Sequence, residues 1–369
     1  MLEAIRNEPP EEDRPSPDIK RLRDAGAGPL ALSGLFILAA FYTLYLARAF
    51  FLPIVLAFLL SFLLSPLVRW LKKLHIPEAL SAALLVFGLL GALGLGIYQL
   101  ATPAYQWVQQ APRSLRKVES KLRDLKKPVQ TVSKATEQME KMAKVGGTKE
   151  PAKVAVTTET LGERMFSRTT DLLANGVVMF ILLYFLLAAG DMFLRKLIKV
   201  LPRLADKKRA VDIAREIETE VSAYLATITV INAILGFAVW GIMSLIGVPN
   251  PLLWGVLAAV TNYIPYLGAI VMIAVLAMVG FLTFDDLPHA LMAPGAFVIL
   301  NLLESYLLTP MILGRRLTLN PVVIFLGLTF WGWLWGIAGA VLAVPIMVVF
   351  KIFCDHSEPL APIGEFLGD

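Results

Sequence analysis

Long apolar runs, separated by short polar clusters, dominate this chain. A helix needs about 20 apolar residues to cross a hydrocarbon core of about 30 Å. The runs of roughly that size before residue 250 are 30–47, 50–64, 79–100, 172–189 and 225–246. Three further apolar blocks follow, at 252–282, 287–313 and 319–350. This pattern predicts an all-α polytopic membrane protein with eight apolar segments.

Two of the late blocks are interrupted at their centres. Block 252–282 contains the stretch VTNYIPYLGAI, and block 319–350 contains WGWLWG followed by Gly339. Proline and glycine weaken or break helices. Each arm around a break has about 12–16 residues, or ~18–24 Å of helix, which is short of a full crossing. We therefore predict about six full spans plus two re-entrant or broken helical hairpins, with long kinked helices as the alternative.

Basic clusters in the short loops favour the hairpins. Short cytoplasmic loops carry an excess of Lys and Arg. If block 252–282 crossed once, the Arg315–Arg316 pair would lie in a short external loop. If it returns, Asp285 and Asp286 lie outside and both arginines lie inside. The basic clusters at 69–75 and 195–209 then also lie inside, so the N and C termini are predicted to be cytoplasmic.

The polar segments divide the chain further. Residues 102–171 are predicted to form a helical extracytoplasmic insert, which from Arg113 to Lys153 carries 12 basic and 5 acidic side chains. Residues 203–224 form an amphipathic cytoplasmic helix that should turn into the span 225–246. The remaining divisions are a disordered cytoplasmic tail at 1–29, N-terminal membrane segments at 30–101, a C-terminal membrane domain at 172–353 and a cytoplasmic tail at 354–369.

Composition excludes several classes of function. The chain is 57% hydrophobic and 17% charged, and its net charge of +5 is explained by positive-inside loops rather than by a nucleic-acid partner. One cysteine, Cys354, excludes an intrachain disulfide framework, and the three histidines are far apart in sequence. The chain has no Walker-type loop and no GxSxG motif. We therefore expect no enzyme activity, no metal and no cofactor, with H⁺ or Na⁺ coupling as the energy source for uphill transport.

Polar residues at membrane depth are the candidate pathway. Glu304 is the one acid well inside a late span, and an ionisable group at that depth is a functional hypothesis by default. The structural alternative is a carboxylate hydrogen-bonded to a neighbouring helix or to a hairpin tip. The other polar candidates are Asn232, Asn262, Tyr263, Tyr266, Asn301, Ser305, Tyr306 and Thr309. Broken helix ends also expose unpaired backbone groups that hold polar solutes or ions. The candidate hinge or gate positions are Pro265, Gly268, Pro310, Gly314, Gly336, Gly339 and Pro345.

Four blocks of this chain resemble signatures of the autoinducer-2 exporter family, also called the AI-2E or PerM-like family. They read FLPIVLAFLLSFLLSPLVRWLKK (51–73), NYIPYLGAIV (262–271), LLESYLLTPMILGRRLTLNPVVIFLGL (302–328) and WGWLWGIAGAVLAVPIMVVFKI (331–352). Ala269 and Ala338 stand where the family often has proline. The resemblance implies a bacterial inner-membrane transporter, described as an exporter of small signalling molecules, with some members linked to sodium/proton exchange. It also implies a homo-oligomer, for which a pentamer fits.

Three functional hypotheses follow. The first is a secondary transporter that exports a small polar solute, of the autoinducer-2 type, by alternating access. The second is a Na⁺(Li⁺)/H⁺ antiporter in which Glu304 titrates. The third is a membrane scaffold that does not transport, and whose basic insert recruits a partner.

Overall fold

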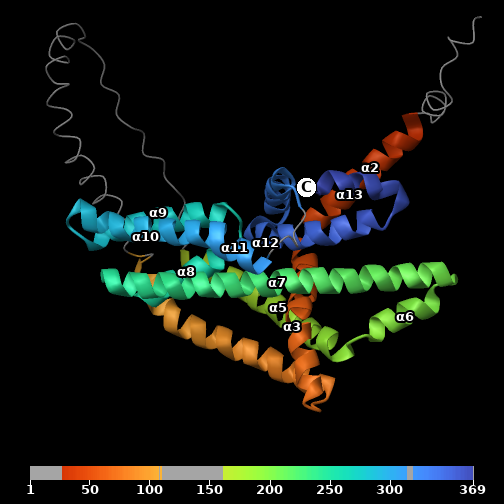
Figure 1. Ribbon diagram of the computed structural model, residues 1–369, viewed down its shortest axis with the longest axis horizontal. Coiled ribbons are helices and arrows are strands. Elements are labelled where there is room, and N and C mark those ends of the chain that lie inside the picture. The colour runs from red at the N-terminus through yellow and green to blue at the C-terminus, as the bar shows by residue number, and fades with distance from the viewer. Residues whose placement is uncertain (1–26, 108, 110–160, 314–318, 369) are drawn as a thin grey trace, which may run out of the picture. The chain divides into compact units, whose positions relative to one another are not determined.

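The computed structural model describes residues 27–107, 109, 161–313 and 319–368, and every regular element in these ranges is a helix (Figure 1). Most of the predicted tail 1–29 and of the predicted insert 102–171 lies outside the described residues. Gly314 and the Arg315–Arg316 pair lie outside them as well.

The chain forms two compact units, which divide after Leu52. The first unit contains α2, Ala27–Leu46, and the first residues of α3, Arg48–Lys73. The second unit, from Pro53 onward, contains the rest of α3 and all later helices.

Helices of membrane-spanning length account for most of the described chain. Five are long and apolar enough to cross a bilayer by length and composition: α3, the Glu78–Trp107 helix, α7 (Leu204–Ile246), the Leu287–Ile312 helix and α12 (Pro321–Asp355), although α12 is interrupted at Gly336. A sixth candidate is α5, Leu161–Ala189, from which α6, Met192–Val200, departs at an angle of 71°. The prediction of an all-α polytopic membrane protein is confirmed.

The first predicted hairpin is formed by α8, Pro251–Thr261, and α9, Leu267–Thr283, with a break at residues 262–266. The two arms come together at the break, because a Cβ atom added to Gly268 would fall on the carbonyl oxygen of Thr261. On the outside of the hairpin, α9 packs along α10, Leu287–Leu303, and Gly280 lies against the carbonyl of Ala290 (Figure 1). The interruption predicted within 252–282 is therefore a true reversal of the chain.

The second hairpin lies within α12. Its helical dihedral angles are interrupted at Gly336, with φ 67° and ψ −146°, a region of backbone space reached almost only by glycine. A Cβ added to Gly339 would fall on the carbonyl oxygen of Trp331, and Gly327 lies against the side chain of Met347. These two pairs become further apart in sequence with distance from Gly336, so the arms run antiparallel. The hairpin predicted for 319–350 is confirmed.

Helix α7 differs from the prediction. We expected an amphipathic helix at 203–224 that turns into a separate span at 225–246, but the two form one continuous helix, Leu204–Ile246. The reason is local: the sequence has no glycine or proline between residue 204 and Gly236, so nothing interrupts the i→i−4 hydrogen bonds. In Figure 1 α7 is the long green helix that runs beside α8.

Contacts within the second unit define two ends of the helix bundle. We call the first the basic end. There Arg69 of α3 pairs with Glu218 of α7 at 2.8 Å, and Glu216 lies 3.3 Å from the ring of His356, just after α12. We call the other the Trp254 end, where the rings of Trp107 and Trp254 meet edge to face with centroids 5.2 Å apart.

The two hairpins enter the bundle from opposite ends. The first begins at the Trp254 end, and Phe284, which follows its second arm, packs into the same apolar cluster as Trp254. The second hairpin ends beside Glu216 at the basic end. Its first residues are held there too, because the Asn320 N–H donates to the carbonyl of Leu367 in α13, Ala361–Leu367, which packs back on α12 at Asp355.

Candidate functional site

The tip of the first hairpin packs against the arms of the second hairpin inside the bundle, and we call this contact the tip junction. Ile264, in the middle of the first tip, packs against Leu328, Ala340 and Ala343, which belong to both arms of the second hairpin. Backbone that turns in a membrane must be sheltered from lipid by protein or water. Here the arms of the second hairpin shelter the first tip, whereas Gly336, at the second turn, is exposed in the single chain.

A cavity of about 160 Å³ lies beside this junction. Its walls come from α3, α7, the first tip and the second arm of the other hairpin. The polar side chains that line it are Tyr224, Thr229 and Tyr263, and Pro345 closes it from the second hairpin. No lining residue carries a carboxylate or a basic group, so the cavity is neutral, with hydroxyl groups set in an apolar wall.

Tyr263 joins the first tip to α7. Its hydroxyl donates to Thr229 Oγ1 at 2.9 Å, and Thr229 Oγ1 in turn donates to the carbonyl of Leu225 at 2.6 Å. Because the threonine proton is already committed to its own helix, the tyrosine must be the donor. Tyr224, the second phenol in the cavity, has no hydrogen-bond partner among the residues that the structure describes.

A second polar contact joins the same two elements. Asn262 donates its side-chain amide to Asn232 Oδ1 at 2.9 Å. Asn232 is only 1% exposed, and its own amide nitrogen is buried without a partner in the described part of the chain. A buried polar group without a partner is costly, so it is a place where a water molecule or a polar solute is favoured.

The backbone of the first tip is bonded internally. Three of its amides donate within the tip: Ile264 to Thr261, Gly268 to Ile264, and Leu267 to Pro265 at 2.7 Å. The last bond closes a γ-turn at Tyr266, whose φ of 63° and ψ of −51° are strained for a residue with a side chain. We expected free main-chain donors at the break, but local turns use most of them. Polar chemistry at the tip therefore rests on side chains.

Glu304 is buried, with 6% of its surface exposed, so the prediction that it faces the protein interior is confirmed. It opens a π-helical turn, Glu304–Leu308, in which the N–H of Thr309 donates to the Glu304 carbonyl. Pro310 explains the wider turn, because proline has no N–H and its ring pushes against the carbonyl four residues earlier. The carboxylate accepts from Thr309 Oγ1 at 2.6 Å and from Ser305 Oγ at 3.3 Å, so both of these partners belong to its own helix.

The structure divides the candidate residues into two groups. It brings together Asn232, Asn262, Tyr263 and Pro345 around the tip junction, near Pro265 and Gly268 of the first tip and Gly339 of the second hairpin, whereas Gly336 is exposed in the single chain. Glu304, Ser305 and Thr309 form a separate cluster before Pro310. Asn301 is partly buried, whereas Tyr266 is 57% and Tyr306 76% exposed in the single chain, and neither lines the cavity.

Sequence reasoning undervalued two residues. Thr229 is an ordinary hydroxyl in a span, where such groups often bond their own helix, and only its distance from Tyr263 gives it a second role. In the sequence, Tyr224 belongs to the apolar face of the predicted amphipathic helix and is therefore not among the candidate residues. Its spacing of eight residues from Asn232, about two helical turns, is the one sequence signal that places both on nearby faces of α7.

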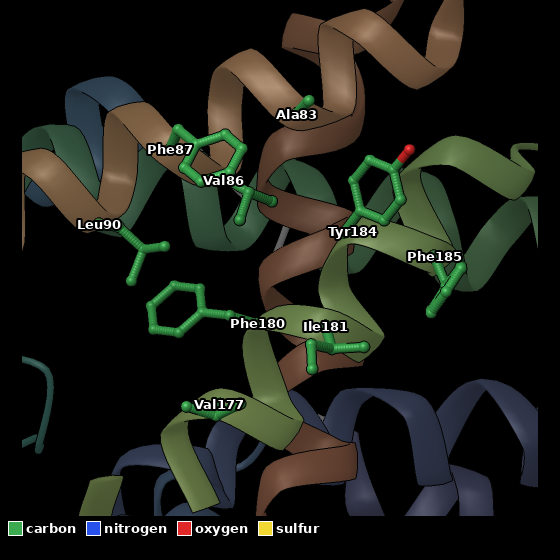
Figure 2. A pocket seen from close by; sticks show the side chains of 9 residues that line it. All are labelled: Ala83, Val86, Phe87, Leu90, Val177, Phe180, Ile181, Tyr184 and Phe185. Atoms are coloured by element: carbon green, nitrogen blue, oxygen red, sulfur yellow. The ribbon is translucent and has the colours of Figure 1, made fainter. Parts of the chain in front are cut away.

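A larger hollow elsewhere does not fit a polar solute. A groove of about 560 Å³ lies between the Glu78–Trp107 helix and α5. Phe87 and Leu90 on one side of it face Val177, Phe180 and Ile181 on the other (Figure 2). Tyr184 carries the one polar side-chain atom among its nine lining residues. A groove of this composition suits hydrocarbon. Nor do any three His, Cys, Asp or Glu side chains in the described ranges group closely enough to hold a metal ion.

Opposed helical hairpins that meet beside a neutral polar cavity, within a bundle of apolar spans, define a multi-pass membrane protein of the transporter type. The chain belongs to the AI-2E transport family: residues 35–358 match the family described as "AI-2E family transporter".

Its relatives carry transport names. The chain is 27% identical over 317 residues to the AI-2 transport protein TqsA of Escherichia coli K12, which covers 86% of this chain and 89% of that protein. It is 26% identical to the putative transport protein YhhT of the same organism, over 92% of this chain and 93% of that one. Bacillus subtilis YueF, also a putative transport protein, is 26% identical over 85% of each chain.

Proposed function

We propose that this protein is a secondary transporter of the bacterial inner membrane that exports a small, neutral, polar solute by alternating access. The observation that carries the proposal is the packing of the first hairpin tip against the opposed second hairpin, beside a cavity with polar side chains but no charged ones. The autoinducer-2 transport named for TqsA makes autoinducer-2 the first solute to test.

Chemistry at the tip supports a neutral hydroxylated solute. Hydroxyl and amide groups exchange hydrogen bonds with alcohols and carbonyls at little net cost, whereas a desolvated ion needs an opposite charge. Tyr263, Thr229 and Asn232 offer such groups. The Tyr224 hydroxyl makes no hydrogen bond with any described residue, so it can bond to a solute. In this mechanism a solute replaces the Tyr263–Thr229 hydrogen bond, which releases the first tip from α7 while the second tip keeps the opposite side closed.

The proposal includes an orientation. With the basic end in the cytoplasm, Arg69, Lys72, Lys73 and the basic residues of α6 obey the positive-inside rule, and both termini are cytoplasmic. The first hairpin then enters from the outside and the second from the cytoplasm. We also propose a homo-oligomer, with a pentamer as the first assembly to test by mass measurement in detergent, because Tyr306, Trp333 and Ile337 are large and exposed in the single chain.

The direct test is solute efflux from proteoliposomes. Tyr263→Phe removes the hydroxyl and keeps the ring, so autoinducer-2 efflux should fall by roughly fivefold, the size of one hydrogen bond. Tyr98→Phe is the matched control, because Tyr98 is 83% exposed and lies outside the cavity. Equal efflux for the wild type and both variants, at equal protein incorporation, would remove the tip junction from the pathway.

The second candidate function is Na⁺(Li⁺)/H⁺ antiport. The buried carboxylate of Glu304 favours it, since its hydrogen-bond partners among the described residues are hydroxyl groups, and an acid in such a place is the kind of side chain that carries protons or binds cations. Glu304→Gln should abolish Na⁺-dependent proton flux in proteoliposomes, whereas Glu365→Gln, an exposed acid on α13, should not change it. If neither solute nor proton flux responds while deletion of 113–153 removes the phenotype, the protein acts as a scaffold.

A further inference from the structure

A second cavity, of about 560 Å³, lies at the basic end of the bundle. It is enclosed by α3, the start of the Glu78–Trp107 helix, the end of α5, α6 and α7. One part of its wall is apolar and includes Phe58, Phe62 and Leu186. The other part carries charges of both signs. An amphipathic cavity of this size calls for an amphipathic ligand.

Helix α6 sets the depth of this cavity in the membrane. It leaves the axis of α5 at 71°, and none of its residues is buried. Phe193 is 59% and Leu197 48% exposed, while Arg195, Lys196 and Lys199 alternate with these apolar side chains. A short helix with this composition lies in the headgroup layer, with its apolar side toward the acyl chains. Since Phe193 and Leu197 also line the cavity, the cavity opens at the level of the lipid headgroups.

The charged wall offers both donors and acceptors. Arg69 gives one N–H to Glu218 at 2.8 Å and keeps further guanidinium donors, and its side chain is 58% exposed. Lys72 pairs with Glu78, and its side chain is 64% exposed. Asp191 lines the same cavity, and its main-chain carbonyl accepts from the N–H of Arg195, but its carboxylate has no ion pair or hydrogen bond with any described residue. The lining therefore carries two basic and three acidic side chains.

We propose that this cavity binds a zwitterionic glycerophospholipid, with an aminoalkyl phosphate headgroup. Its phosphate lies against Arg69 and Lys72, its ammonium against Asp191, and an acyl chain lies along the phenylalanine wall. A purely anionic headgroup would meet the same two bases but would also face three carboxylates. The ammonium of a zwitterion turns that repulsion into an ion pair, so charge complementarity selects the zwitterion.

Lipid binding to the full-length protein tests the proposal. Native mass spectrometry in detergent measures the affinity for phosphatidylethanolamine and for phosphatidylglycerol with identical acyl chains. The wild type should prefer phosphatidylethanolamine by roughly three- to fivefold, the size of one exposed ion pair. Asp191→Asn should abolish that preference, and Arg69→Gln should weaken the binding of both lipids.

Lys73→Gln is the matched control, because Lys73 is exposed and next to Lys72 but does not line the cavity. It should leave the preference unchanged. Equal affinity of the wild type for the two lipids overturns the proposal, as does a preference that survives in Asp191→Asn. Competition by soluble glycerophosphoethanolamine as strong as that by the lipid overturns it too, since the site would then take a water-soluble solute. Asp191 and Arg69 are exposed, so elution of the variants as the wild-type species on size-exclusion chromatography separates a lost site from a lost fold.

Discussion

Asn262, at the tip of the first hairpin, donates its side-chain amide to Asn232 on α7 across 2.9 Å, and this bond closes the α7–α8 pair at the depth where the chain reverses. The acceptor is almost fully buried, at 1% exposure. A side-chain contact between amides, rather than a main-chain ladder, therefore fixes the first tip to the long helix.

A double-mutant cycle measures this contact. Each of Asn232→Ala and Asn262→Ala should lower the free energy of unfolding by about 1–3 kcal/mol, because each leaves the other amide, fully buried for Asn232 and partly buried for Asn262, without this partner. The double variant should lose less than the sum of the two, with a coupling of about 0.6–1.5 kcal/mol. Thermal unfolding of the purified protein in detergent reads the effect. Strict additivity would show that the two amides do not interact.

Close approach at the second hairpin is tested by a pair of glycines. Gly339→Ala should destabilise the protein by about 1–3 kcal/mol, since the new methyl group collides with the carbonyl of Trp331 and the arms must separate. Gly332→Ala, in the same hairpin, adds a methyl group whose nearest neighbour is Ala340 Cβ at 3.8 Å, an ordinary contact. The melting temperature should therefore fall for Gly339→Ala and change little for Gly332→Ala. Equal shifts would argue against the antiparallel arms.

The effect of backbone strain at Tyr266 on stability can be measured separately from the effect of its side chain. Tyr266 has φ 63°, and left-handed backbone costs an L-residue about 1–2 kcal/mol that glycine avoids. Tyr266→Gly and Tyr266→Ala both remove the phenol, so the difference between them reports the backbone. We expect the glycine variant to be the more stable by about 1 kcal/mol in thermal unfolding. A more stable alanine variant would mean that the γ-turn is absent.

Orientation is testable with a single introduced thiol. Cys354 is 0% exposed, so the wild-type protein should not react with an impermeant maleimide, and no cysteine-free background is needed. In intact cells Asp285→Cys should be labelled from outside, whereas Lys73→Cys, at the basic end, should be labelled only after the membrane is opened. If Asp285→Cys were labelled only from the cytoplasm, the proposal that the first hairpin enters the membrane from outside would be wrong.

The sequence predicts the architecture well because membranes impose strong, local rules. Interrupted blocks of about thirty residues predict hairpins, and both reversals occur where Pro265 and Gly336 lie. The sequence predicts less well whether two neighbouring helical segments form one helix. Helix α7 continues through the boundary expected at 224–225, because amphipathicity shows which face meets water and does not require a bend. The burial of Glu304 also follows from sequence, since the cost of exposing a carboxylate to lipid leaves few alternatives.

The site was harder to predict than the fold. The sequence indicates Asn232, Asn262 and Tyr263 only as single candidates. Their contacts depend on how α7 and the first tip are aligned, and partners 30 or more positions apart in sequence do not reveal that alignment. At the first tip the expectation of free backbone donors was wrong for most of them, because turn geometry is decided by a few dihedral angles, such as those of Tyr266. Tyr306 lies in the family-like block 302–328, yet its side chain, in the π-helical turn before Pro310, is outside the core.

The unbroken helix α7 has a mechanical consequence. At 1.5 Å per residue, Glu218 and Asn232 lie about 21 Å apart on one stiff rod, and a rod of 43 residues is about twice as long as the hydrocarbon layer is thick. If this helix tilts as a rigid body, its ion pair with Arg69 and its hydrogen bond with Asn262 are displaced together. A change of tilt imposed on α7 at the basic end is therefore transmitted to the first hairpin tip without passing through a flexible joint.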